Sequence, residues 1–345
     1  MVVTFKIVTM ASAVEEKVVD IFHDHFYDTG KVKVDGSTLK CWKSGGHGDQ
    51  TFLEVLQNSC NPGFVKLGQL LGKERLFSYI EKFGFGEKSG VDLMGEGTGI
   101  IFPFEKIGNV ELATTAFGQG ISVTPVQQVM AVSAVVNGGY LYTPYLVKRI
   151  SNHTNTTIQE NTPILRRKVI SSETSSIMRL ALENVVAKGG GKSAYIEGYR
   201  IGGKTGTAQK SENGVYLVNN YIMSFMAVVP SNDPKAVLYL AIDNPKHTAM
   251  LSSYTTTPIA RRILLDIIDA LEIPKQEGET PKDLEWNDKV TYPVPKVVGM
   301  SLENAKKSLY PFQIIVEGEG NTVVEQSPKA GEILEDGSKI RLFLQ

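Results

Sequence analysis

The residues best suited to chemistry lie in the segment 202–208, which reads Gly-Gly-Lys-Thr-Gly-Thr-Ala. The segment is predicted to form a strand. A lysine there brings an ammonium group beside a site, and Gly206 lets the backbone of a substrate approach an edge strand closely. The match of Lys204-Thr205-Gly206 is short, and a plain strand with one glycine would explain it. Whether this match indicates a functional site therefore depends on partner residues elsewhere in the chain.

Two upstream segments supply such partners. Residues 58–62 contain Ser59-x-Asn61, and Lys6 would close a Ser-x-x-Lys motif if position 3 held a serine. That position holds Val3. Taken alone, Ser59 and Asn61 are explained as a cap at a helix start. Lys6, Ser59 and Lys204 nevertheless follow the order of three motifs in penicillin-recognising enzymes, which favours a site.

On these motifs the chain resembles the transpeptidase domain of a monofunctional class B penicillin-binding protein. Four further stretches, at 95–100, 116–125, 137–139 and 225–230, resemble that family's framework. Residues 294–300 and 326–331 resemble one PASTA repeat, a module associated with penicillin-binding proteins and receptor kinases of Gram-positive bacteria. A single repeat after such a domain is similar to the sporulation branch of the class, which acts on the spore cortex.

The resemblance implies a fold and a mechanism. The fold would be α/β mixed (α+β), with an antiparallel sheet of the transpeptidase and β-lactamase type flanked by helices. A serine at position 3 would attack the carbonyl between the terminal D-alanines of a peptidoglycan stem peptide, and Lys6 would accept its proton. Ser59 and Asn61 would relay protons and hold the peptide, while Lys204 would keep the region cationic. The implied substrate-binding residues are Thr205, Gly206 and Thr207.

Val3 is the departure from the family pattern. An isopropyl group can neither attack a carbonyl nor be acylated, so we expect this chain not to form an acyl-enzyme. Thr4 is turned about 100° away along the helix and is a poor substitute. β-Lactam antibiotics would be covalent partners only with serine at position 3. Two alternatives stay open: a non-catalytic peptidoglycan or muropeptide module or scaffold, and a serine β-lactamase relative, which the framework stretches and the PASTA-like tail disfavour.

Composition limits other functions. The 345 residues carry 36 Lys+Arg against 37 Asp+Glu and no long basic block, so nucleic-acid binding is not expected. Cys41 and Cys60 are too few for a disulfide framework or a Cys-rich zinc site, and one bridge between them is left open. Cys60 is expected to be a small buried residue. No metal or cofactor is expected, because His23 and His25 lack a third ligand nearby and should face solvent.

The start of the chain imitates a secretion signal, but Lys6 interrupts its apolar run. A buried helix over 4–19 is expected instead. No stretch reaches about 18 apolar residues, so no membrane span is predicted. The resemblance implies an extracytoplasmic protein whose longer parent is membrane-anchored. We expect the present chain to be a soluble fragment without the anchor or the first strands of the domain.

The elements that must position these residues follow from periodicity. The buried helix would carry Lys6, and the strand at 202–208 would carry Lys204 beside strands at 225–229 and 236–242. Helices are predicted at 125–134, 173–187 and 258–271, and the P-loop-like residues 188–193 are expected to be a plain loop. Prolines and charges at 273–292 predict a linker between a transpeptidase domain at 1–272 and a PASTA domain at 293–345. Within the tail, a short helix at 302–309 followed by strand-like runs at 313–316 and 339–344 predicts a small α+β module.

Overall fold

The computed structural model describes residues 5–212, 215–245, 252–283, 291–310, 312–335 and 338–345. They form two compact units, one of residues up to 244 with 252–282 and the other chiefly of residues from 283 onward. The division falls inside the segment 273–292, where a linker is predicted. The predicted domain boundaries themselves stay predictions.

Helices and strands alternate along the first unit, and the second unit is mostly strand. The helices are α1 (Lys6–Glu15), α2 (Phe52–Gln57), α3 (Asn61–Lys82), α4 (Asn109–Ala116), α5 (Pro125–Val136), α6 (Ser172–Lys188), α7 (Ser252–Ala270) and α8 (Leu302–Ser308), with short 3-10 turns η2 (Phe104–Lys106) and η3 (Lys192–Ala194). The strands are β1 (His25–Asp28), β2 (Lys31–Val34), β3 (Ser37–Lys40), β4 (Gly48–Thr51), β5 (Tyr140–Thr143), β6 (Arg149–Ser151), β7 (Thr157–Glu160), β8 (Ile164–Lys168), β9 (Gly202–Glu212), β10 (Val215–Val229), β11 (Ala236–Asp243), β12 (Thr291–Pro293), β13 (Gln313–Glu317), β14 (Val323–Ser327), β15 (Ile333–Glu335) and β16 (Lys339–Leu344). None of the helices within the described ranges is both long enough and apolar enough to cross a membrane.

Helix α1 lies in the core of the first unit. Every residue from Lys6 to Val14 is buried, because small and apolar side chains cover the whole circumference of the helix. Helices α3, α5 and α6 pack around it. The predicted buried helix is thus confirmed, although it ends at Glu15. Because Lys6 is its first residue and is buried, the fold carries an amine into the core.

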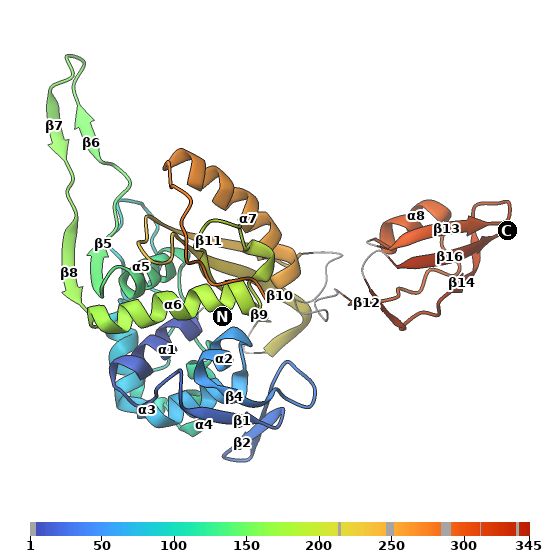
Figure 1. Ribbon diagram of the computed structural model, residues 1–345, viewed down its shortest axis with the longest axis horizontal. Helices are drawn as coiled ribbons and strands as arrows, with labels where there is room; N and C mark the ends of the chain where they lie inside the picture. The colour runs from blue at the N-terminus through green and yellow to red at the C-terminus, as the bar shows by residue number, and fades with distance from the viewer. Residues whose placement is uncertain (1–4, 213–214, 246–251, 284–290, 311, 336–337) are drawn as a thin grey trace. The chain divides into compact units, whose positions relative to one another are not determined.

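Three antiparallel strands in the order β11-β10-β9 form the three-stranded sheet of this unit, which also contains the strand pairs β1-β4, β2-β3, β5-β8 and β6-β7 (Figure 1). Alternate side chains of β10 face opposite sides, so Phe225 and Ala227 pack with α7 while Met226 and Val228 join the core around α1. Lys204 of β9 lies directly opposite Met226 and therefore points toward the same core. The predicted α+β fold with an antiparallel sheet flanked by helices is confirmed.

Helix α7 begins earlier than predicted. A proline is favoured in the first turn, so the sequence suggests a start at Pro258, but the helix starts at Ser252 and contains Pro258 in its interior. The hydroxyl of Ser252 is close to the Gly206 carbonyl of β9 and bonds to the Thr207 hydroxyl. These contacts fix the helix start against the sheet, which a local propensity cannot anticipate.

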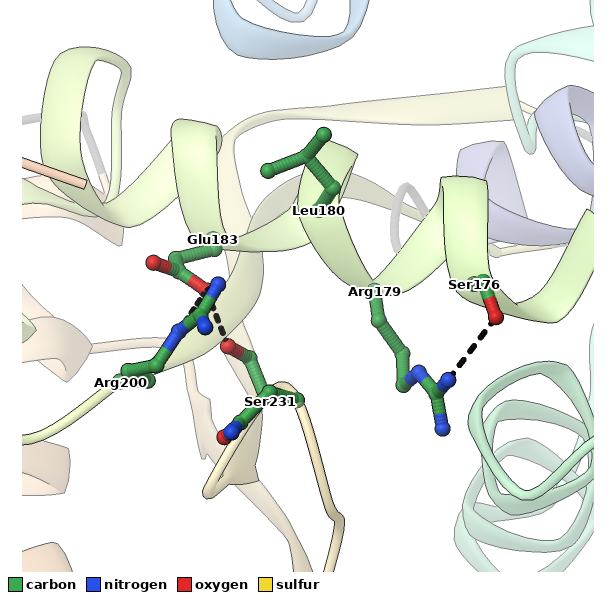
Figure 2. Close-up of a pocket in the computed structure, with 7 residues that line it drawn as sticks. Ser176, Arg179, Leu180, Glu183, Arg200 and Ser231 are labelled. Atoms are coloured by element: carbon green, nitrogen blue, oxygen red, sulfur yellow. Dashed lines mark hydrogen bonds and ion pairs between the residues drawn. The ribbon is translucent and has the colours of Figure 1, made fainter. Parts of the chain in front are cut away.

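A small pocket of about 130 Å³ opens beside α6 (Figure 2). Its lining includes none of the predicted site residues. Glu183, only 3 % exposed, accepts hydrogen bonds from Arg200 Nε at 2.9 Å and Ser231 Oγ at 2.5 Å. The backbone N–H of Thr280 also donates to Glu183, at 2.8 Å. The pocket therefore marks a buried polar junction that holds α6 to three other segments.

Replacing Glu183 with alanine is expected to lower the free energy of unfolding by about 3–5 kcal/mol, because it leaves the partly buried Arg200 and two further donors without their acceptor. Urea unfolding measures the change. The control is Glu173→Ala, the same substitution at an exposed position in the first turn of α6, with an expected cost below about 1 kcal/mol. Equal losses in the two variants would contradict the assigned role of Glu183.

The second unit has its own core. Strands β13 and β16 pair in parallel and β14 pairs antiparallel with β16, with α8 supplying Ala305 to the apolar cluster. The short helix and the strands at 313–316 and 339–344 that the sequence predicts are present. The tail is thus a small α+β module, as expected.

Candidate active site

The Lys6 amine meets the Ser-x-Asn segment directly. Lys6 is 1 % exposed, and its Nζ donates hydrogen bonds to Ser59 Oγ at 2.9 Å, to Ser59 O at 2.8 Å and to Asn61 Oδ1 at 2.7 Å. The fold therefore brings together two of the three motifs, which lie more than fifty residues apart in the sequence. All three ammonium hydrogens have acceptors.

The turn between α2 and α3 presents these acceptors. Helix α2 begins with a capping box made by Thr51 and Glu54, and the chain then reverses at Ser59, whose φ of 54° is left-handed. The start of α3 is capped by Cys60, which accepts from the Gly63 N–H at 3.5 Å. The capping role proposed as the plain alternative for Ser59 and Asn61 thus falls to Cys60. Their polar groups are directed to Lys6 instead.

Burial sets the protonation of Lys6. Desolvation lowers its pKa from 10.5 to about 7, against a smaller opposing effect of the two cysteines. A lysine with such a pKa holds a sizeable neutral fraction at neutral pH. Neutral amine can accept a proton, which is the property required of a general base.

Lys204 reaches the same region from the sheet. It is fully buried on β9, and its Nζ donates to the Thr205 carbonyl at 3.2 Å. Burial lowers the pKa of Lys204 well below its usual value, and the charge of Lys6 lowers it further. The structure thus places Lys204 near enough to Lys6 for the two amines to repel each other when both are protonated.

Thr205 and Thr207 lie on the opposite face of β9, which ends the sheet in the described residues. Both are partly exposed. Thr207 Oγ1 and Ser252 Oγ are 2.8 Å apart, so α7 orients this hydroxyl. A Cβ on Gly190 would lie 3.2 Å from Thr205 Oγ1, which places the loop after α6 beside the strand. Ser252 and this loop border the site, although the sequence places neither of them there.

Val3, the residue at the implied nucleophile position, lies outside the described residues, as does Thr4. Its identity is known from the sequence alone. The described part of the site consists of two buried amines, a serine hydroxyl, an asparagine amide and an edge strand with two threonines. These groups can take up, relay and return a proton beside an extended peptide. The described residues do not include the position at which the family carries its nucleophilic oxygen.

Comparison with known proteins assigns the chain to a family. The model of the penicillin binding protein transpeptidase domain matches residues 4–265, and that of the PASTA domain matches residues 292–345. This chain belongs to the penicillin-binding protein transpeptidase family. It is 54 % identical over 342 residues to stage V sporulation protein D of Bacillus subtilis, covering 99 % of this chain and 53 % of that protein.

More distant relatives agree. Peptidoglycan D,D-transpeptidase FtsI of Escherichia coli is 27 % identical, with 66 % of this chain and 37 % of that protein covered. The crystal structure of penicillin binding protein 3 from Mycobacterium tuberculosis, complexed with aztreonam, matches with a TM-score of 0.73 and 26 % identity over 81 % of this chain and 64 % of that one. The chain spans about half the length of curated relatives such as these two: 53 % of stage V sporulation protein D and 49 % of a peptidoglycan D,D-transpeptidase FtsI homolog of Mesostigma viride. The match to the penicillin-binding protein family disfavours the alternative that the chain is a serine β-lactamase relative.

Proposed function

We propose that this chain is the D,D-transpeptidase-type domain, with its PASTA module, of a protein that crosslinks peptidoglycan during spore formation. The observation that carries the proposal is the contact of the buried Lys6 amine with Ser59 and Asn61. A base with a pKa near neutrality, next to a relay hydroxyl and a second buried amine, suits serine acyl transfer. The similarity to stage V sporulation protein D supports the spore-cortex assignment.

In an intact site the serine at position 3 would attack the carbonyl of the penultimate D-alanine and pass its proton to neutral Lys6. The tetrahedral oxyanion would accept hydrogen bonds from the backbone N–H groups of residues 3 and 207. Its collapse would expel the terminal D-alanine, whose amine takes a proton from Lys6 through Ser59, and leave an ester. An amine of a second stem peptide would attack that ester, forming the crosslinking amide and regenerating the serine.

The stem peptide would add to β9 as an extra strand, with main-chain hydrogen bonds giving affinity. Lys204, whose pKa is lowered by burial, would attract the peptide carboxylate in its protonated form. The Thr205 and Thr207 hydroxyls would donate to that carboxylate, and Gly206 would allow close backbone approach. None of these contacts needs a nucleophile, so we propose that the chain binds the peptide although Val3 prevents acylation.

Thr207→Val is expected to weaken binding of a peptide ending in D-Ala-D-Ala about ten- to hundredfold, because a hydrogen bond to a charged group is worth about 1.5–3 kcal/mol. Isothermal titration calorimetry measures the affinity. Thr154→Val, in the exposed turn between β6 and β7, is the matched control and should bind like the parent. Absence of binding by the parent at millimolar peptide, or equal weakening in the control, would count against the proposed peptide site.

A non-catalytic module for peptidoglycan fragments is the second candidate, and Val3 is the observation that favours it. The Val3→Ser chain separates the two, because only the first candidate predicts acylation of a serine there. Both candidates act outside the cytoplasmic membrane, where peptidoglycan is assembled. Membrane anchoring of a longer parent protein stays a prediction, as do its partners beyond stem peptides and β-lactams.

A further inference from the structure

Four side chains with metal-binding atoms meet beneath the Ser59 turn. The ligand atoms of Asp28, Cys41, His47 and Cys60 all lie within 4.8 Å of one another. Asp28 Oδ2 is 2.9 Å from His47 Nδ1 and 3.3 Å from Cys60 Sγ, and Cys41 Sγ is 3.4 Å from His47 Nδ1. One carboxylate oxygen, one imidazole nitrogen and two sulfurs thus converge on a single point. We name these four residues the Cys-His-Asp cluster.

The fold builds this cluster from four separate element ends. Asp28 ends β1, Cys41 follows β3, His47 precedes β4 and Cys60 caps α3. The loop between β3 and β4 is pressed against the end of β1, since a Cβ at position 46 would lie 2.3 Å from the carbonyl oxygen of Asp28. Only glycine permits that approach. Backbone geometry therefore holds the ligands together before any ion arrives.

The cluster buries a carboxylate and an imidazole, which ordinary apolar packing does not contain. Asp28 and Cys60 are fully buried, and the His47 side chain is 5 % exposed. The Asp28 carboxylate receives backbone N–H donors from Gly30 at 2.7 Å and His47 at 3.0 Å. Buried carboxylates in proteins are paired or coordinate metals. Within the described residues, no hydrogen bond engages His47 Nε2, so Nδ1 is the nitrogen that the cluster uses.

We propose that the Cys-His-Asp cluster binds one Zn²⁺ ion in tetrahedral geometry. Zinc prefers this mixture of thiolate, imidazole and carboxylate, and its bond lengths of about 2.0–2.3 Å separate tetrahedral ligands by roughly 3.3–3.8 Å. The present spacings reach this geometry with small side-chain movements. Binding would release the thiol protons to solvent without any change of oxidation state. The expectation of no metal rested on the small number of cysteines and on the isolation of His23 and His25, whereas Asp28 and His47 complete a ligand set with both cysteines.

The metal would act on the active site through Cys60, which lies between Ser59 and Asn61. Two more contacts tie the same turn to the ligand-bearing loop: Trp42 Nε1 donates to the Asn58 carbonyl at 2.7 Å, and Asn61 Nδ2 donates to the Lys40 carbonyl at 3.2 Å. Zinc would thus fix the acceptors of Lys6, a positioning role. This consequence rests on the proposed function, but the metal site itself does not.

Metal analysis and cobalt substitution test the proposal on the whole chain, kept reduced with a phosphine. We expect one zinc per chain by elemental mass spectrometry. Co²⁺ should give the visible bands of a tetrahedral ion together with sulfur-to-cobalt charge transfer, in a one-to-one titration. Because neither readout involves peptide or penicillin, failure here would be distinct from failure of the proposed function.

Variants place the ion. Cys41→Ser and His47→Gln should weaken zinc binding at least tenfold in competition with a chelating dye. His25→Gln is the matched control, because the exposed His25 bonds to Asp49 across the same β1-β4 strand pair and its replacement should leave the affinity unchanged. Should either cluster variant fail to fold, the cobalt spectrum of the parent still decides. Less than a tenth of an equivalent of metal after incubation with zinc, a cobalt spectrum without sulfur bands, or a Cys41–Cys60 disulfide that persists in reductant and zinc would overturn the proposal.

Discussion

Val3→Ser should convert a chain that penicillin leaves unmodified into one that carries a stoichiometric covalent adduct. The substitution supplies a hydroxyl three residues before Lys6, which is the spacing of nucleophile and base in the family's Ser-x-x-Lys motif. Lys6 is already bonded to Ser59 and Asn61, so the base and its relay need no rearrangement. Intact-mass spectrometry after incubation with a penicillin reads the result directly as the mass of one drug molecule per chain.

Val2→Ser is the matched control, since it makes the same chemical change one position away and outside the Ser-x-x-Lys spacing. It should give no adduct. Adding Lys6→Ala to Val3→Ser should reduce the acylation rate by roughly 10²–10⁴, the usual contribution of a positioned base. An adduct on the parent chain would refute the assignment of Val3 as the disabling residue. An unreactive Val3→Ser chain would instead refute the view that the rest of the site is competent.

The same variant should show the protonation of Lys6 in its pH profile. Because the pKa of Lys6 is lowered to about 7 by burial, the neutral amine is the minor form below that pH and the major form above it. The acylation rate should rise about tenfold per pH unit at acidic pH and level off above about 7. Stopped-flow or quenched labelling between pH 5 and pH 9 would measure it. A rate that still climbs steadily to pH 9 would mean that Lys6 keeps an ordinary lysine pKa.

Site residues can be predicted from the sequence when they belong to short motifs that follow one another in a distinctive order. Lys6, Ser59 and Lys204 were identified in this way, and the structure brings Lys6 and Ser59 into direct contact. Asp28 and His47 cannot be identified in this way, because neither belongs to a recognisable short motif. Only the pairing of β1 with β4 brings the two residues together. Ser252 is hidden for a similar reason, since tertiary contact with β9 overrides the local preference for a helix start at Pro258.

The fold shows the same division. The buried helix carrying Lys6 and the alternating pattern of β10 follow from side-chain types that have to avoid water, which is a local property. Register between strands is not local. Whether Lys204 or Thr205 faces the helix core depends on which residue of β10 lies opposite, and only the pairing of Lys204 with Met226 decides it.

That orientation leads to the second large effect, which concerns stability. Lys204→Met should stabilise the chain at pH 8, because methionine has a similar unbranched shape without the cost of burying an ammonium group. Lys204 has its pKa lowered well below 10.5 by burial and by Lys6. Between that folded-state pKa and 10.5 the unfolded chain binds a proton that the folded chain does not. The parent is therefore penalised at pH 8, and the penalty fades as the pH rises toward 10.

The lowered pKa of Lys204 also fixes how stability changes with pH. The free energy of unfolding of the parent should rise with pH from 8 to 10, by about 1.4 kcal/mol per unit for each such proton, and the advantage of Lys204→Met over the parent should shrink accordingly. Urea unfolding at three pH values measures both slopes. Lys210→Met on the same strand is the control, because the Lys210 ammonium pairs with Asp243 at 2.8 Å and is partly exposed, so its effect should stay within about 0.5 kcal/mol. If Lys204→Met instead lowered the free energy of unfolding at pH 8, the buried amine would stabilise the fold. Its burial could then no longer be explained as a stability cost that the active site imposes.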